Sequence, residues 1–321
     1  MATTASAFPS LDDVREARRR ITGYADTTPL VLRDGLGYKL EFLQHTGSFK
    51  VRGAFNAALQ LSQAECARGV VAVSGGNHGL AIAYVGKVLG IPATVVMPKA
   101  TPQFVVERAT ADGARVVLTE TIAEAFARVD ELARDGLALL HPFDDVRVIA
   151  GQGTLALEML EQMPEVKTLV VSIGGGGLIS GVASTIKQMK PDVTIVGVET
   201  KGADAMRQAL DAGRPVTLPG ITSIARTLGA PSVSERTLHA VRRYVDDVVV
   251  VDDRDAVAAI IELQEKLGVL VEPAASCTHA ALGLGLVERV GPTLLLLCGS
   301  NVRFDEVVGW RQRFGDSSAV C

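Results

Sequence analysis

Short runs of valine, isoleucine and leucine alternate along the chain with longer segments whose apolar residues recur at helical spacing. Continuous apolar strands between helices are typical of parallel sheet, because such a sheet is covered on both faces. The pattern therefore predicts an α/β fold with mostly parallel sheets flanked by helices. The predicted strands lie at 69–74, 93–97, 115–118, 168–172, 194–199, 247–251 and 293–298.

The predicted helices fill the segments around these strands. Ser10 followed by Asp13 indicates an N-cap with a carboxylate in the first turn, and so a helix over 11–21. The remaining helices are expected at 55–61, 79–89, 102–112, 122–134, 153–163, 178–189 and 254–268.

Composition narrows the class of protein. Charged residues make up 21% of the 321 residues and the formal net charge is −4, so neither nucleic acid nor an anionic membrane is expected as a partner. No apolar run approaches the ~20 residues that span a bilayer. The four cysteines form no CxxC pair and have no zinc-ligand spacing, which argues against a disulfide framework and a structural metal. We therefore expect a cytoplasmic globular protein.

Three glycine-rich segments, 74–79, 174–177 and 299–301, follow predicted strands. Ligands of parallel α/β sheets bind outside the carboxyl ends of the strands. The four glycines at 174–177 precede a predicted helix, where backbone N–H groups and the helix dipole favour a phosphate. A tight turn without a ligand is the alternative. Neither the GxxxxGK[ST] nucleotide loop nor an early GxGxxG motif is present.

Lys50 follows Phe49 near the start of a helix, within the segment 46–53. Partial burial lowers the pKa of a lysine and makes its amine a better nucleophile. A solvated surface lysine is the commoner alternative. The residues of this segment alone do not decide between a nucleophilic amine and a solvated surface lysine.

The segment 46–53 resembles the cofactor-lysine segment of the fold-type II pyridoxal-phosphate enzymes, in the family of serine/threonine dehydratases (threonine ammonia-lyases) and serine racemases. The resemblance continues in order through 28–30, 39–41, 74–79, 141–145, 150–154, 174–177, 197–199, 271–273 and 298–301. It implies the two-domain fold of the tryptophan synthase β-like enzymes. The large domain would comprise 1–47 plus 142–321, with a small α/β domain inserted at 48–141. The likeness also implies a homodimer.

The same resemblance implies how pyridoxal 5'-phosphate would be held. Lys50 would carry the cofactor as a Schiff base and then accept the proton from the substrate Cα. Phe49 would pack against the cofactor ring, and Asn77 would bond its hydroxyl. The phosphate would lie on five consecutive backbone amides, those of Gly174, Gly175, Gly176, Gly177 and Leu178.

Cys298 corresponds to the residue beside the pyridine nitrogen in this family, where serine or cysteine is found. A neutral thiol does not keep that nitrogen protonated as a carboxylate does. The ring is then a weaker electron sink, which favours prompt elimination over a long-lived carbanion. Without the resemblance, a small buried hydrophobe would be the better interpretation of Cys298.

The family likeness also implies contacts to a small amino-acid substrate. Ser74, assigned a catalytic role, and the amides from Gly75 through His78 would hold the substrate carboxylate. Phe143 would line the pocket for the substrate side chain and favour a small apolar β-substituent. Ser223 would be a second substrate contact, in a segment that departs from the family pattern.

Two departures from the racemase pattern are informative. Racemases carry a serine where this chain has Gly75, so racemisation on both faces of Cα is not expected. Their divalent-cation site uses a glutamate, a main-chain carbonyl and an aspartate. Glu199 and the Ala203 carbonyl fit that site, but Ala205 stands at the aspartate position. A mono- or divalent cation therefore stays an open expectation.

Together these features predict a pyridoxal-phosphate-dependent lyase that converts L-threonine and/or L-serine to a 2-oxoacid and ammonia by β-elimination. Four alternatives remain: a dehydratase for threo-3-hydroxyaspartate or phenylserine, a β-replacement enzyme, a serine racemase, or a protein that binds the cofactor without catalysis. The residue run 48–53 fits dehydratases better than β-replacement enzymes.

Overall fold

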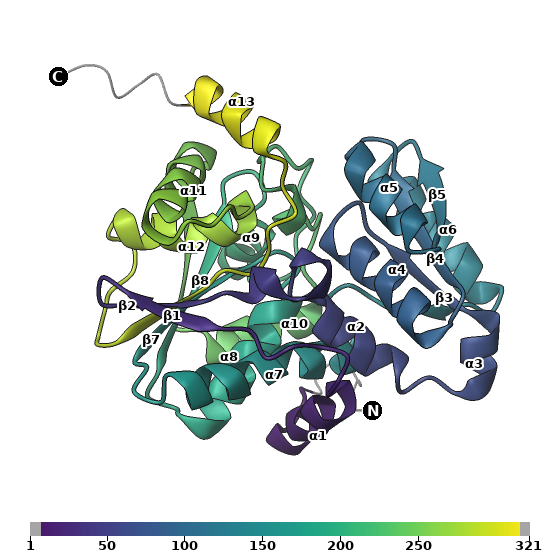
Figure 1. Cartoon of the computed structure of the whole chain (residues 1–321), viewed down its shortest axis with the longest axis horizontal. Coiled ribbons are helices and arrows are strands. Elements are labelled where there is room, and N and C mark those ends of the chain that lie inside the picture. The colour runs from purple at the N-terminus through teal and green to yellow at the C-terminus, as the bar shows by residue number, and fades with distance from the viewer. Residues whose placement is uncertain (1–7, 315–321) are drawn as a thin grey trace.

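The computed structural model describes residues 8–314 and shows two sheets side by side, each covered by helices (Figure 1). Helix α1 (Leu11–Ile21) begins at the predicted N-cap. The Ser10 hydroxyl accepts from the Asp13 N–H, and the Asp13 carboxylate accepts from the Ser10 N–H. This reciprocal pair satisfies two of the amides that a helix start leaves without partners.

The larger sheet has six strands. All neighbours in it are parallel except β1 and β2, which form an antiparallel hairpin at one edge. The turn of this hairpin, Asp34 and Gly35, has positive φ at both residues. In spatial order the strands are β1 (Leu30–Arg33), β2 (Leu36–Lys39), β10 (Thr293–Leu296), β7 (Thr168–Ser172), β8 (Thr194–Thr200) and β9 (Asp247–Val251).

Helices cover both faces of the larger sheet (Figure 1). Its buried strands are continuous runs of apolar residues, as expected for a sheet without a solvent face. The helices are α7 (Val146–Gln162), α8 (Gly177–Met189), α9 (Ala205–Ala212), α10 (Glu235–Tyr244), α11 (Asp253–Leu267), α12 (Pro273–Gly283) and α13 (Phe304–Phe314).

The smaller sheet has four parallel strands and forms the blue lobe in Figure 1. Its strands in order are β5 (Arg115–Thr119), β4 (Ala93–Pro98), β3 (Val70–Val73) and β6 (Ala138–Leu139). The helices around it are α3 (Gln63–Arg68), α4 (Asn77–Leu89), α5 (Gln103–Ala111) and α6 (Ile122–Arg134). Helix α2 (Lys50–Ala58) packs against both α4 and α7, and so joins the two lobes.

The predicted α/β fold of mostly parallel sheets is confirmed, and two helix boundaries are corrected. Helix α2 begins at residue 50 rather than 55, and α7 begins at 146 rather than 153. Glycines, which disfavour helix interiors, lie inside both segments. A Cβ on Gly151 would lie 2.6 Å from the Arg52 carbonyl oxygen, so glycine permits the close crossing of α2 and α7. The boundaries of the two domains stay a prediction.

Two further predictions, on membrane-spanning helices and on the cysteines, can be compared with residues 8–314. No helix between 8 and 314 is long and apolar enough to cross a membrane. Cys66, Cys277 and Cys298 are free thiols, and Cys321 lies outside the described residues.

Candidate active site

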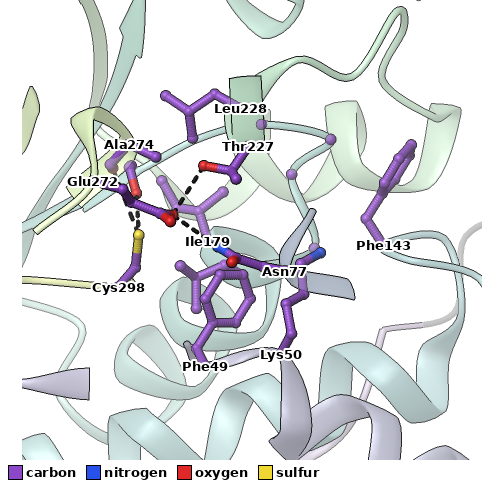
Figure 2. Close-up of a pocket in the computed structure, with 16 residues that line it drawn as sticks. Phe49, Lys50, Asn77, Phe143, Ile179, Thr227, Leu228, Glu272, Ala274 and Cys298 are labelled. Carbon is purple, nitrogen blue, oxygen red and sulfur yellow. Dashed lines mark hydrogen bonds between the residues drawn. The ribbon is translucent and has the colours of Figure 1, made fainter. Parts of the chain in front are cut away.

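A cavity lies where β3, β7 and β10 end, as expected for a ligand site in parallel α/β sheets (Figure 2). All nine cofactor residues predicted from the sequence line it: Phe49, Lys50, Asn77, Gly174, Gly175, Gly176, Gly177, Leu178 and Cys298. Phe143 also lines it. Lining residues that were not predicted are Ser172, Ile179, Thr227, Leu228, Glu272 and Ala274.

Lys50 is the first residue of α2, and its amine reaches the cavity from the helix start (Figure 2). The Nζ donates a hydrogen bond of 2.8 Å to the carbonyl oxygen of Pro142. Burial lowers the pKa of Lys50 to about 8, although the nearby Glu272 carboxylate favours the charged form. The neutral amine, which is the nucleophile, is therefore accessible near neutral pH.

The tetraglycine loop, residues 174–177, connects β7 to α8. Gly176 has φ of 92°, a conformation that favours glycine. A Cβ on Gly177 would lie 2.8 Å from the Phe143 Cα, and one on Gly174 would lie 3.1 Å from the Leu228 Cα. The loop thus has no room for side chains, and the amides of the first turn of α8 have no carbonyl partner within the helix. Such amides suit a phosphate group.

A hydrogen-bonded cluster surrounds Asn77 at the start of α4 (Figure 2). The Asn77 Nδ2 donates to Glu272 Oε1 at 2.8 Å, and the Thr227 hydroxyl donates to the same oxygen at 2.9 Å. Asn301 donates from Nδ2 to the Asn77 Oδ1 at 2.6 Å and from its backbone N–H to Glu272 Oε2 at 3.1 Å. Burial raises the pKa of Glu272, while these donors and Lys50 act in the opposite direction.

Glu272 is one of the six lining residues for which the sequence analysis predicted no role. It precedes Pro273, the first residue of α12, and a residue followed by proline is typical of an ordinary helix start. Its place in the segment 271–273, which belongs to the family resemblance, was the available signal. Its partners Thr227 and Asn77 are 45 and 195 residues away in the chain, beyond the reach of local pattern.

Cys298 lies at the end of β10, on the opposite side of the cavity from the loop of Phe143 (Figure 2). Its Sγ accepts from the Ser172 hydroxyl at 3.4 Å and donates to the Ala274 carbonyl oxygen at 3.6 Å. Burial, assisted by the charge of Glu272, raises the pKa of Cys298 to about 12. The thiol is therefore neutral at physiological pH, which matches the expectation from the sequence.

The predicted substrate loop lies beside the cavity rather than in its lining. The Ser74 hydroxyl accepts from the Gly76 N–H at 3.1 Å, and His78 Nε2 contacts the Leu140 carbonyl oxygen at 2.8 Å. Burial, assisted by the charge of Lys50, lowers the pKa of His78 to about 3, so its ring is neutral. Substrate contacts of Ser74, Gly75 and His78 stay predictions.

Ser223 does not line the cavity either. Its hydroxyl donates to Asp253 Oδ1 at 2.6 Å, lies 2.8 Å from the Thr200 hydroxyl and accepts from the Ala225 N–H. All of its hydrogen-bonding capacity is therefore used within the protein. A contact from Ser223 to substrate would require these bonds to rearrange, and it stays a prediction.

Glu199, predicted as a cation ligand, is a buried residue of β8, and its carboxylate faces the start of α9. Its two oxygens accept from the backbone N–H groups of Met206 and Arg207, at 2.9 and 2.7 Å. Burial raises the pKa of Glu199 to about 8. Among residues 8–314 no group of three or more His, Cys, Asp and Glu side chains is placed to hold a metal. A cation held by Glu199 and the Ala203 carbonyl stays a prediction.

The residues around the cavity fit pyridoxal phosphate. The tetraglycine loop offers amides for its phosphate, Lys50 offers an amine of lowered pKa, and Asn77 offers a donor. Cys298 offers a neutral group.

Known proteins agree with this assignment. Residues 21–299 match the family model described as "Pyridoxal-phosphate dependent enzyme". An L-threonine ammonia-lyase from Thermotoga maritima is 38% identical over 91% of this chain and 76% of that protein. A serine racemase from Arabidopsis thaliana is 40% identical over 84% of each chain. The structure of maize serine racemase superimposes with a TM-score of 0.89 at 35% identity, over 96% of this chain and 98% of that one. The chain therefore belongs to the family of pyridoxal-phosphate-dependent enzymes.

Proposed function

We propose that this protein is an ammonia-lyase that converts L-threonine and/or L-serine to the 2-oxoacid and ammonia. The observation that supports it most is the position of Lys50, whose amine of lowered pKa faces the same cavity as the tetraglycine loop. When bound, pyridoxal phosphate would stabilise the negative charge that develops at the substrate Cα.

In this proposal each residue of the site has one task. The amides of the tetraglycine loop and Leu178 would hold the phosphate, Phe49 would pack against the ring, and Asn77 would bond the ring oxygen. Cys298 would offer a neutral thiol to the ring nitrogen. Lys50 Nζ receives the proton that leaves Cα. Loss of this proton and of the β-hydroxyl, as water, leaves an enamine that hydrolyses to the 2-oxoacid and ammonia.

The charges of the cavity support a substrate with an uncharged side chain. Lys50 and Glu272 are the only charged residues among the lining residues, and Glu272 is acidic. A second carboxylate, as in threo-3-hydroxyaspartate, would find no further cation there and would be repelled by Glu272. The ring of Phe143 borders the cavity and supports a small apolar β-substituent, such as the methyl of threonine.

Racemisation is supported less well, because Gly75 has no side chain that could exchange a proton with the second face of Cα. β-Replacement is also supported less well, because the residue run around Lys50 fits dehydratases better.

We further propose that the protein acts as a homodimer in the cytoplasm, with a small domain at 48–141. Light scattering of the purified protein at micromolar concentration tests the dimer, and a monomer would contradict it.

Release of 2-oxoacid from the purified protein tests the function. The panel would contain L-threonine, L-serine, their D-isomers and threo-3-hydroxyaspartate, with and without added pyridoxal phosphate. We expect release from L-threonine or L-serine that disappears in Lys50→Ala. The matched control is Lys99→Ala, which removes an exposed lysine paired with Glu120 and should leave release unchanged. No release from any substrate, with cofactor bound, would overturn the proposal.

A further inference from the structure

The carboxamide of Asn77 is held at both of its polar atoms. Its Oδ1 accepts from Asn301 Nδ2 at 2.6 Å, and its Nδ2 donates to Glu272 Oε1 at 2.8 Å. Because an amide that is rotated by 180° would place donor against donor at Asn301, only one orientation satisfies both contacts. In this orientation one N–H of Nδ2 remains for a ligand in the cavity that Asn77 lines.

Asn301 is itself fixed from two sides. Its Nδ2 also donates to the Thr46 carbonyl oxygen at 2.8 Å, and its Oδ1 accepts from Arg108 Nη1 at 2.6 Å. Arg108 belongs to α5 in the lobe of the smaller sheet, whereas Asn301 follows β10 in the larger one. A chain of donors therefore runs from Arg108 through Asn301 and Asn77, and Glu272 is its final acceptor.

Glu272 is suited to that position by its charge as well as by its place. It is 2% exposed, and its three partners in the cluster are all donors: Asn77, Thr227 and the N–H of Asn301. A carboxylate accepts at both oxygens. A glutamine of the same shape would accept with its oxygen but place its NH₂ group against another N–H. Only an acidic residue of this length satisfies all three donors.

We propose that Glu272 is a positioning residue for the cofactor, which fixes the Asn77 carboxamide so that its free N–H points at the ring oxygen of pyridoxal phosphate. This inference rests on the proposed function, because it requires that cofactor in the cavity. Glu272 acts through Asn77 and need not touch the reacting atoms.

The test is a double-mutant cycle in which cofactor binding is measured rather than turnover. Apo-protein of the wild type, Glu272→Gln, Asn77→Ala and the double variant is titrated with pyridoxal phosphate. The dissociation constant and the wavelength of the visible absorbance band are recorded. We expect each single variant to bind about 10- to 100-fold more weakly, as for a lost charge-assisted hydrogen bond. The double variant should bind no more weakly than Asn77→Ala, within about twofold.

Ser276→Ala is the matched control, because Ser276 is buried in α12, the helix that Glu272 precedes, and donates to the Ala256 carbonyl without lining the cavity. It should lower the thermal midpoint without moving the dissociation constant or the band. Losses that multiply in the double variant, or a band unmoved by Glu272→Gln, would overturn the positioning role.

If Glu272→Gln does not fold, Asn301→Ala replaces it in the same cycle, because Asn301 fixes the other end of Asn77. Coupling to Asn77 then supports the inference and multiplying losses overturn it. A wild type that binds the cofactor yet releases no 2-oxoacid defeats the proposed function alone. Release of 2-oxoacid with multiplying losses defeats the positioning role alone.

Discussion

The amine of Lys50 lies 2.8 Å from the carbonyl oxygen of Pro142, a residue 92 positions further along the chain. This contact joins the start of α2 to the segment that carries Phe143 onto the tetraglycine loop. The partner is a neutral carbonyl rather than a carboxylate, so it does not offset the desolvation of the ammonium as an ion pair would. The lowered pKa of Lys50 follows from this arrangement.

Capture of the cofactor should depend on pH through this amine. The neutral form attacks the cofactor, so uptake by the apo-protein should accelerate up to about pH 8 and level off above it. Stopped-flow absorbance between about pH 6 and 10, a range that spans the pKa values of a lowered and an ordinary lysine, measures this rate. Free pyridoxal phosphate with a model amine is the control. A rate that keeps rising to the highest pH would show that the pKa of Lys50 is not lowered.

The same shift has a consequence for stability with a defined sign. A lysine in an unfolded chain titrates near 10.4, whereas Lys50 in the folded apo-protein has a pKa of about 8. Between these values the unfolded state binds more protons, so the free energy of unfolding should rise with pH in that window. Lys50→Met removes this group. The difference in urea midpoint between the variant and the wild type should therefore change from pH 7 to pH 10, in favour of the wild type.

A buried ion network should be needed for the stability of the region around Lys50. Arg52 donates to Glu41 and Glu158, each at 2.6 Å, and Lys39 donates to Glu158 at 2.6 Å. All four side chains are buried. Arg52→Met leaves two carboxylates with a single lysine, and we expect a loss of about 3–5 kcal/mol in the free energy of unfolding.

Urea unfolding at neutral pH measures the loss, and Arg18→Met is the control. Arg18 pairs with Glu161 on the surface, where both side chains are well exposed. Such a pair contributes at most about 1 kcal/mol. Equal losses in the two variants would contradict the importance of the buried network.

The strands and the glycine segments could be predicted from the sequence because their signals are local. The apolar run 168–172 and the four glycines after it are visible as a pattern, and the structure has β7 over those five residues. The antiparallel pair β1 and β2 was not predicted, because β1 has only three consecutive apolar residues and β2 includes a glycine and a lysine. Short hairpins of this kind depend on tertiary contacts.

The site could be predicted only where a family motif assigns a role to each residue. Lys50 and the tetraglycine loop belong to such motifs and line the cavity. Thr227 and Glu272 were not predicted, because their place in the cavity depends on the packing of η4 (Arg226–Leu228), a short 3₁₀ helix, against α12. Ser223 was predicted by register and lies outside the lining, since the segment around it departs from the family pattern.

Close packing between α7 and α8 makes a strong prediction about one glycine. A Cβ on Gly181 would lie 2.2 Å from the Ile149 carbonyl oxygen and 2.7 Å from the Gly153 nitrogen. Both are backbone atoms, so the helices would have to separate. Gly181→Ala should lower the free energy of unfolding by about 1–3 kcal/mol or more.

Gly283 at the end of α12 is the matched control, because a Cβ there meets nothing within 4 Å and its φ is not positive. Gly283→Ala should be neutral or stabilise by up to about 1 kcal/mol, since alanine restricts the unfolded chain. Thermal unfolding of both variants separates a packing effect from a general intolerance of glycine replacement.

The space beside Gly75 predicts how this chain responds to the serine that racemases carry there. A Cβ at Gly75 would lie 2.4 Å from the Thr101 hydroxyl oxygen, which is buried and without a hydrogen-bond partner in the described chain. Gly75→Ser should therefore destabilise the protein by about 1–3 kcal/mol. Thr101→Ala should restore part of this loss in the double variant, because it removes the oxygen that the new side chain meets. Thermal midpoints of the wild type, both single variants and the double variant measure the coupling.

D-serine formed from L-serine by the same four proteins gives the functional readout. We expect the double variant to form more D-serine than Gly75→Ser, since its serine is free to adopt its preferred rotamer. Additive midpoints with equal D-serine formation would show that Thr101 does not restrict position 75.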